Sequence, residues 1–212
     1  MISHSCRAFR MTIAESAKDR YKMAIQKRAE LEKLYEEMQD CKKCADISKM
    51  EENSFDLRRG FGKLKGYGDG RFMFVAQNPS YVRIPHIVTP CDAGVSRDLL
   101  WLLQKEGFED KDIFFTNLVK CSTPNNRAPS DKEVEICTEE WLRREMKIIR
   151  PKLIVPIGGV ASEYVKKMVE RETEYQGIPV RSIWHPSYVF RKRTFEHYTN
   201  QLKELVELKE KL

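Results

Sequence analysis

The stretch RFMFVAQNPS, residues 71–80, decides the fold, because it has the pattern of a buried strand that ends abruptly in a polar loop. Its apolar part lacks helical spacing, and Pro79 cannot continue a central hydrogen-bonded ladder. Ligands of open parallel sheets bind at the carboxyl ends of the strands. The loop that begins with Gln77 and Asn78 is therefore a candidate functional site.

Three further apolar runs are expected to form strands, and helical patterns separate them. They cover residues 113–117, 153–157 and 180–184. Strands that alternate with helices in this way predict a three-layer α/β/α sandwich with a central, mainly parallel four-stranded sheet. The run at 113–117 ends at Asn117, and His185 follows the last run. We expect Asn117 and His185 to lie on the same edge of the sheet as Gln77 and Asn78.

Amphipathic helices are expected over residues 12–38, 96–106, 130–149, 160–170 and 194–212. Thr12 with Glu15, and Ser130 with Glu133, have the spacing of capping boxes. Ser96 is expected to cap the second helix, and a glycine at position 107 to end it. In the first helix the apolar positions, Tyr21 and Ile25 among them, are expected to face inward.

The length and composition predict one domain. A chain of 212 residues with 41% hydrophobic residues can bury one substantial core. We divide it into an N-terminal helical extension (1–40), a core (41–193) and a C-terminal helix (194–212). It has no apolar run of membrane-spanning length and no signal-peptide core, so we expect a cytoplasmic monomer. The net charge of +6 and clusters of arginine suit a polyanion partner, although a mixed-charge surface is the ordinary alternative.

Four of the six cysteines form a pattern that is typical of metal ligands rather than disulfides. They are Cys41, Cys44, Cys121 and Cys137. Four thiolates can hold zinc or an iron–sulfur cluster. Only the first pair is closely spaced, and this favours a cluster over a zinc ribbon; unligated core cysteines are a third interpretation. Cys91 could replace one ligand, whereas Cys6 stands apart.

Together these motifs resemble the uracil-DNA glycosylase superfamily, and within it the iron–sulfur branch known as family 4. The resemblance covers residues 41 to about 191 and rests on the cysteine pattern, TNLVKC with PNNRAP (116–129), IVPIG (154–158) and HPS (185–187). It implies a [4Fe–4S] cluster on the four patterned cysteines, with DNA as the partner. It also implies a monofunctional hydrolase that flips out uracil, cleaves its N-glycosidic bond and leaves an abasic site; no lysine is evident for a lyase step.

The resemblance also assigns roles to two side chains. His185 is expected to donate a hydrogen bond to the charge that develops on O2 of the leaving base. Asn117 corresponds to the residue that reads the base: its amide can donate to uracil O4 and accept from N3–H. Cytosine presents the opposite polarity, so discrimination requires that neighbours hold the amide in one orientation.

The first motif departs from its usual form in the iron–sulfur branch. That branch has Gly-Glu-Gly/Ala-Pro-Gly where this chain has AQNPS (76–80), which is closer to other branches. By that correspondence Asn78, next to Gln77, is expected to position the water. Ser80 replaces a tyrosine that excludes the methyl group of thymine in some relatives, so the range of bases could be wider. The iron–sulfur branch usually also has a phenylalanine that stacks on the flipped base, and this chain has no aromatic residue at the corresponding position. Tyr81 is a candidate for that stacking contact.

DNA binding is expected after the last strand. Base flipping requires a side chain that fills the gap in the duplex, and Tyr188, Val189 and Phe190 are apolar residues in that position. Ser187 and the basic run from Arg191 to Arg193 are expected to contact phosphates. A hydrophobic turn packed on the final helix is the structural alternative.

Three rival functions remain open at the level of sequence. One is a glycosylase whose main base is hypoxanthine or mismatched thymine. Another is a non-catalytic iron–sulfur protein that binds DNA on the same scaffold. A third is a zinc-stabilised protein that binds nucleic acid.

Overall fold

A computed structural model of the chain describes residues 4–39, 41–44, 70, 72–79, 94–109, 112–121, 123 and 127–212. At its centre is a parallel sheet with the strand order β2-β1-β3. Strand β1 spans Phe72–Ala76, β2 spans Ile113–Asn117 and β3 spans Leu153–Pro156. The predicted α/β architecture with a parallel sheet is confirmed. Phe72 pairs with both Ile113 and Leu153, so β1, the strand predicted within residues 71–80, is the central one.

The expected fourth strand, residues 180–184, is reduced to two isolated bridges, Ile154 with Val180 and Ile157 with Ile183. Arg181 N donates to Ile154 O, and Ile183 N donates to Pro156 O, each at 3.0 Å. The hydrogen bond between these two would need an N–H from Pro156, and proline has none. The segment therefore lies along β3 as a parallel strand would, but its ladder is interrupted at that residue. Among the described residues the sheet has three strands instead of the predicted four.

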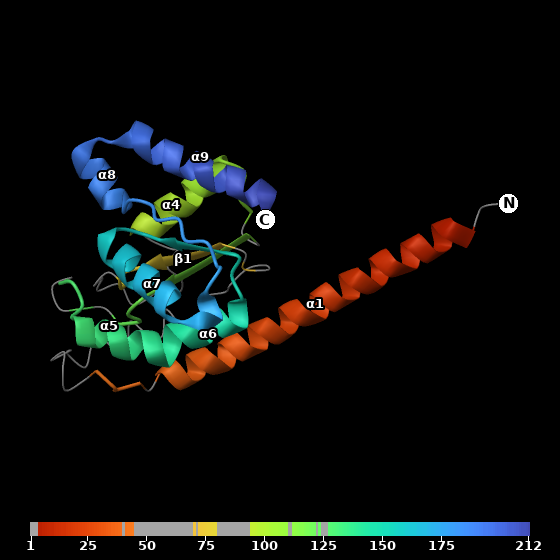
Figure 1. The fold of residues 1–212 in the computed structure, drawn as a ribbon, viewed down its shortest axis with the longest axis horizontal. Helices are drawn as coiled ribbons and strands as arrows, with labels where there is room; N and C mark the ends of the chain where they lie inside the picture. The colour runs from red at the N-terminus through yellow and green to blue at the C-terminus, as the bar shows by residue number, and fades with distance from the viewer. Residues whose placement is uncertain are drawn as a thin grey trace.

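Helices cover both faces of the sheet (Figure 1). Those on one side are α4 (Gly94–Lys105), α8 (Pro186–Lys192) and α9 (Phe195–Lys211). Those on the other side are α1 (His4–Gln39), α5 (Asp131–Cys137) and α6 (Arg143–Ile149), with a π-helical turn, Thr138–Leu142, between the last two. The other helices within the described residues are α7 (Gly159–Arg171), which follows β3, and a short 3₁₀ turn, Thr173–Tyr175.

The helix boundaries agree with the sequence signals only in part. The capping box of Ser130 and Glu133 is confirmed at the start of α5. The one expected from Thr12 is wrong, because α1 begins at His4 and no glycine or proline interrupts residues 4–11. Helix α4 likewise begins at Gly94, so Ser96 lies inside the helix and does not cap it.

The first helix packs on the domain only through its C-terminal part. Leu34 and Met38 are buried there, whereas Tyr21 and Ile25, which were expected to face inward, are 69% and 53% exposed. Figure 1 shows the reason, since the N-terminal half of α1 extends away from the sheet and the other helices. Phe195 at the start of α9 is also an apolar helix residue that the fold leaves exposed, at 49%.

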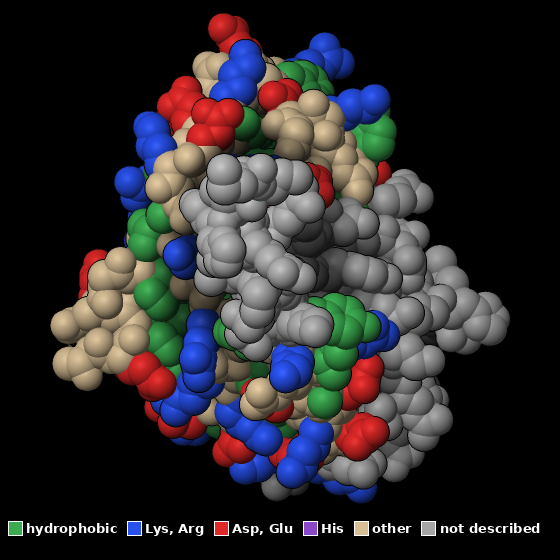
Figure 2. All heavy atoms as spheres, turned by 90° about the vertical axis from the view of Figure 1, so that its right-hand side faces the viewer, with side chains coloured by type: hydrophobic (Ala, Val, Ile, Leu, Met, Phe, Trp, Pro, Cys, Tyr) green, Lys and Arg blue, Asp and Glu red, His purple; other side chains and the backbone are tan. Residues whose placement is uncertain are grey.

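The face towards which α1 extends has a mixed charge (Figure 2). Lysine and arginine side chains alternate there with acidic side chains in the part of the chain that is coloured. This arrangement is the ordinary solvated surface and does not distinguish that face as a DNA-binding side. Among the described helices, none is long and apolar enough to cross a membrane.

Candidate active site

A cavity of about 830 Å³ opens at the carboxyl edge of the sheet, where β1 and β3 end. Its described lining consists of Ala76, Gln77, Asn78, Pro79, Ile157, Gly158, Gly159, Val160, His185, Ser187, Phe190 and Arg191. The cavity therefore brings together the loop after β1, the glycine turn before α7 and the start of α8. Gln77, Asn78 and His185, which are far apart in the sequence, meet there as the strand-end argument predicted.

Main-chain hydrogen bonds hold His185 at this edge. Ile183 N donates to Pro156 O, and Gly158 N donates back to Ile183 O at 2.9 Å, so the segment before His185 is tied to the end of β3. Gly158 has φ +84°, and a Cβ there would lie 3.2 Å from the Cβ of His185. Only glycine allows this backbone conformation and this close approach together.

The imidazole of His185 is held as a neutral hydrogen-bond donor. It caps α8, and its Nδ1 accepts a hydrogen bond of 3.3 Å from the backbone N–H of Ser187. Burial lowers the pKa of His185, and the positive charge of Arg191 lowers it further. With Nδ1 occupied as an acceptor, the single proton of the neutral ring is on Nε2. The side chain can therefore donate from Nε2 to a group in the cavity.

The side-chain amide of Asn78 is also fixed by its neighbours. Its Nδ2 donates to Pro79 O and to Thr123 Oγ1, both at 3.1 Å. Its Oδ1 accepts from Gln77 Nε2 at 2.9 Å. Both N–H groups are used, so the polar capacity that remains is the second lone pair of Oδ1. A molecule bound next to this oxygen must therefore donate a hydrogen bond to it.

Asn117 lies at the end of the neighbouring strand. It pairs in register with Ala76, and it is only 4% exposed. It belongs to the same edge of the sheet as Asn78, but it is not among the described residues that line the cavity. The backbone after it continues to follow the β1 loop, since Leu118 N donates to Ala76 O and Val119 N donates to Gln77 O.

A buried ion pair supports this strand end from behind. Lys120 Nζ lies 2.6 Å from Glu145 Oε2, 2.6 Å from Thr116 Oγ1 and 2.8 Å from Asn117 O. The side chains of Lys120 and Glu145 are 4% and 1% exposed. The backbone N–H of Lys120 also donates to Cys137 Sγ at 3.2 Å. One residue thus connects the end of β2 with α6 and with the last residue of α5. The sequence analysis missed this role, although a lysine within the short apolar run LVK could have suggested a buried cation.

Helix α8 presents side chains with different exposures beside the cavity. Phe190 is 57% exposed and lines the cavity with Ser187 and Arg191. Tyr188 is 40% exposed and makes an edge-to-face contact with the ring of Trp184. Val189 is 1% exposed, so its side chain packs in the core and does not reach the surface. The segment, for which a hydrophobic turn was the structural alternative, is a short helix that ends at the left-handed, exposed Arg193.

Three of the four patterned cysteines, Cys44, Cys121 and Cys137, interact electrostatically. Burial raises the pKa of Cys137, the charge of Lys120 lowers it, and the thiols of Cys121 and Cys44 raise it further. Cys41 is half-buried and packs against the core near the end of α1. Within the described part of the chain, no three His, Cys, Asp or Glu side chains are grouped closely enough to hold a metal ion in the present arrangement.

For three residues named in the sequence analysis the prediction stays untested. Ser80 and Tyr81, expected to contact the base, and Cys91, the alternative ligand, lie outside the described residues.

Residues 65–206, more than half of the chain, match the uracil DNA glycosylase superfamily. The chain belongs to this superfamily. Among curated proteins it is similar to a type-4 uracil-DNA glycosylase of Archaeoglobus fulgidus, with 29% identity over 84% of this chain and 92% of that protein. A type-4 uracil-DNA glycosylase of Sulfurisphaera tokodaii is 33% identical over 64% of this chain and 57% of that protein.

A relative from another branch is also similar. A type-5 uracil-DNA glycosylase of Pyrobaculum aerophilum is 31% identical over 44% of this chain and 45% of that protein. The predicted membership of the uracil-DNA glycosylase superfamily is therefore confirmed, and several type-4 relatives agree with the predicted branch.

Proposed function

We propose that this member of the superfamily is a DNA-repair glycosylase that hydrolyses the N-glycosidic bond of uracil in DNA and leaves an abasic site. The observation that carries the proposal is the pair of fixed side chains in one cavity, the free acceptor on Asn78 and the neutral donor on His185. The type-4 relatives are named uracil-DNA glycosylases, which supports the same activity.

In the proposed reaction the bond between C1′ of the sugar and N1 of uracil breaks, and N1 keeps the electron pair. Negative charge then spreads over the base, including O2, where His185 Nε2–H is proposed to donate. Because the imidazole is neutral, this donation does not require protonation of the enzyme. One such preorganised donor is worth about 3 to 4 kcal/mol of transition-state stabilisation.

Asn78 is proposed to position the attacking water. The remaining lone pair of its Oδ1 accepts one O–H of the water, so a lone pair of the water oxygen is free to face C1′. The water oxygen forms the new bond to C1′, and its proton passes to solvent or to the departing base. An amide is a weak base, but an oxocarbenium-like sugar needs orientation of the water more than its activation.

Asn117 is proposed to read the Watson–Crick edge of the base. Its burial at the end of β2, with its carbonyl held by Lys120, supports a fixed position for the side chain. In the orientation that donates to O4 and accepts from N3–H, the amide suits uracil and opposes cytosine.

DNA contacts are proposed for the exposed part of α8. Phe190 or Tyr188 would occupy the gap left by the flipped nucleotide, since both side chains reach the surface. Ser187, Arg191 and Arg193 would contact phosphates around it. We propose a reaction without a lyase step and therefore without strand cleavage.

We also propose a [4Fe–4S] cluster on Cys41, Cys44, Cys121 and Cys137. The electrostatic effect of Cys121 and Cys44 on the buried thiol of Cys137 supports a common centre. Thiolates are the ligands of such clusters, and burial keeps the Cys137 thiol protonated unless a metal replaces the proton. When bound, the cluster would supply a covalent link between the segment after α1, the loop after β2 and the end of α5.

The test is single-turnover cleavage of labelled oligonucleotides that contain uracil, hypoxanthine or thymine opposite guanine, in single and double strands. We expect uracil to be released, and the rate to fall at least about 100-fold in His185→Ala. Release of another base would assign a different substrate to the same cavity. Binding of DNA without release of any base would favour the non-catalytic alternative, and unchanged turnover in both His185→Ala and Asn78→Ala would falsify the assignment of the site.

A further inference from the structure

We infer that Thr123 is a positioning residue that sets the orientation of the Asn78 side-chain amide, and that a hydrogen-bond relay from the start of α5 holds Thr123 in place. The inference rests on the proposed role of Asn78 in positioning water. It gives a function to contacts that lie outside the cavity lining, between the β1 loop and α5.

The first step is the polarity of the Thr123 hydroxyl. This hydroxyl has one proton, and it donates that proton to Arg127 O at 2.5 Å. Thr123 is fully buried, so water does not offer it another acceptor. Towards Asn78 the hydroxyl oxygen can therefore act only as an acceptor, and Nδ2 is the group of the amide that meets it, at 3.1 Å.

The second step is the cost of the alternative orientation. If the Asn78 amide rotated by half a turn, Oδ1 would face two acceptors, Thr123 Oγ1 and Pro79 O. Nδ2 would then face the Nε2 donor of Gln77. Each contact would then join two acceptors or two donors, and an N–H group would point to the place where the proposed mechanism needs an acceptor. Thr123 is thus one of three neighbours that select the productive orientation.

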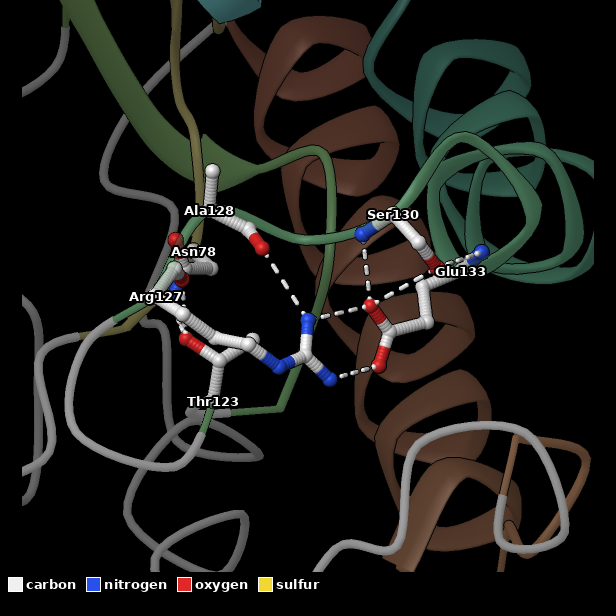
Figure 3. Close-up of polar contacts among 6 residues, drawn as sticks. All are labelled: Asn78, Thr123, Arg127, Ala128, Ser130 and Glu133. Carbon is white, nitrogen blue, oxygen red and sulfur yellow. Dashed lines mark hydrogen bonds and ion pairs between the residues drawn. The ribbon is translucent and has the colours of Figure 1, made fainter.

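The third step is the anchor of the relay. Glu133 has a fully buried side chain and holds the guanidinium of Arg127 with two hydrogen bonds, of 2.7 and 2.8 Å. The same carboxylate accepts from the N–H of Ser130 at 2.6 Å, and Arg127 Nη1 also donates to Ala128 O. Figure 3 shows these residues in a continuous arrangement from the start of α5 to Asn78.

The relay therefore starts from a rigid capping box and ends at an active-site amide. Burial acts to raise the pKa of Glu133, but hydrogen bonds from Arg127 and Ser130 outweigh it and hold the pKa below its ordinary value. The carboxylate is consequently charged at neutral pH, which keeps the Arg127 backbone, and with it the acceptor of the Thr123 proton, in one position.

The test compares Thr123→Val, which removes the hydroxyl at nearly constant volume, with Thr123→Ser, which keeps it. In single turnover on a uracil-containing duplex we expect Thr123→Val to be about five- to tenfold slower, with little change in DNA affinity. Thr123→Ser should recover most of the rate. In an Asn78→Ala background the valine substitution should have no further effect, because the amide that it acts on is absent.

Thr199→Val is the matched control. Thr199 donates its hydroxyl to Phe195 O on the exposed surface of α9 and is not among the described residues that line the cavity, so its removal should leave the rate unchanged. If Thr123→Val does not fold, Thr123→Ala provides a second variant without the hydroxyl. Equal rates for the wild type and a folded variant without the hydroxyl, or additive losses in the Asn78→Ala background, would overturn the inference.

A second readout does not depend on catalysis. In NMR spectra of the ¹⁵N-labelled full-length protein, both side-chain N–H protons of Asn78 should exchange slowly with solvent, because both are hydrogen-bonded. In Thr123→Val one of them should exchange faster, and in Thr123→Ser both should stay slow. If the wild type releases no uracil, the proposed function fails, but the exchange rates still show whether Thr123 holds the Asn78 amide. Unchanged exchange of both Asn78 side-chain protons in Thr123→Val rejects the inference by itself.

Discussion

Replacement of Lys120 by methionine should strongly destabilise the protein. Lys120 Nζ makes three hydrogen bonds of 2.6 to 2.8 Å, and two of its partners, Thr116 and Asn117, form the end of β2. Methionine fills a similar volume but leaves the carboxylate of Glu145 without its cation. That side chain is 1% exposed, and its other oxygen, Oε1, has no hydrogen-bond partner within the described structure.

The size of the effect follows from this burial. Breaking a buried ion pair by removing one partner costs about 3 to 5 kcal/mol, because an uncompensated charge remains in the core. For a chain of this length, 1 kcal/mol corresponds to a change of about 2 to 4 °C in the unfolding midpoint, so we expect a fall of about 6 to 20 °C. Lys132→Met is the matched control, since Lys132 pairs with Glu135 at the surface and should change stability by less than about 1 kcal/mol.

The assay is urea denaturation followed by circular dichroism, with the thermal midpoint as a second measure. The double variant Lys120→Met, Glu145→Leu should recover much of the loss, because it removes the isolated charge together with its partner. A loss of less than about 1 kcal/mol for Lys120→Met, or no recovery in the double variant, would refute the reasoning that the pair is an essential buried contact.

Three further predictions concern the site. The glycosylase rate should stay constant as the pH falls to the ordinary histidine value of 6.5 and decline only below it, because the pKa of His185 is lowered. In that lower window the unfolded state binds more protons than the folded state, so stability also falls as the pH falls. A decline of the rate that begins above 6.5 would contradict this assignment. Gly158→Ala should cost about 1 to 3 kcal/mol of stability and reduce kcat by displacing His185, and an unchanged rate would show that the close approach does not matter. The purified protein should contain about four irons per chain, which Cys137→Ser should lower, whereas zinc in place of iron would reject the proposed cluster.

Much of the fold could be predicted because buried parallel strands have a direct signature in the sequence. The runs that form β1, β2 and β3 are apolar on both faces, and polar residues of the candidate site follow β1 and end β2. The fourth strand could not be judged in the same way. Its sequence is suitable, but its ladder depends on an N–H that Pro156 of another strand lacks.

The positions of Asn78 and His185 at one edge of the sheet could be predicted, because each residue follows an apolar run. Their roles stay predictions. Contacts between residues that are distant in the sequence could not be predicted. Lys120 and Glu145 are 25 positions apart, and Asn78 and Thr123 are 45 positions apart. Nothing in the local pattern of either chain segment indicates that they meet. The predicted helix starts at Thr12 and Ser96 were wrong for a different reason. A capping motif marks a possible start, but the residues before it can also be helical.

The most direct test of the central claim is analysis of the products from a duplex with one uracil, under single-turnover conditions with the protein in excess. For hydrolysis without a lyase step, we expect free uracil in an amount equal to the substrate consumed, and a strand that stays intact until alkali cleaves it at the abasic site. The account also predicts that, in ¹⁸O-labelled water, the new oxygen on C1′ carries the label. Stable binding of the duplex with no free base released, or strand breakage without alkali, would contradict the account.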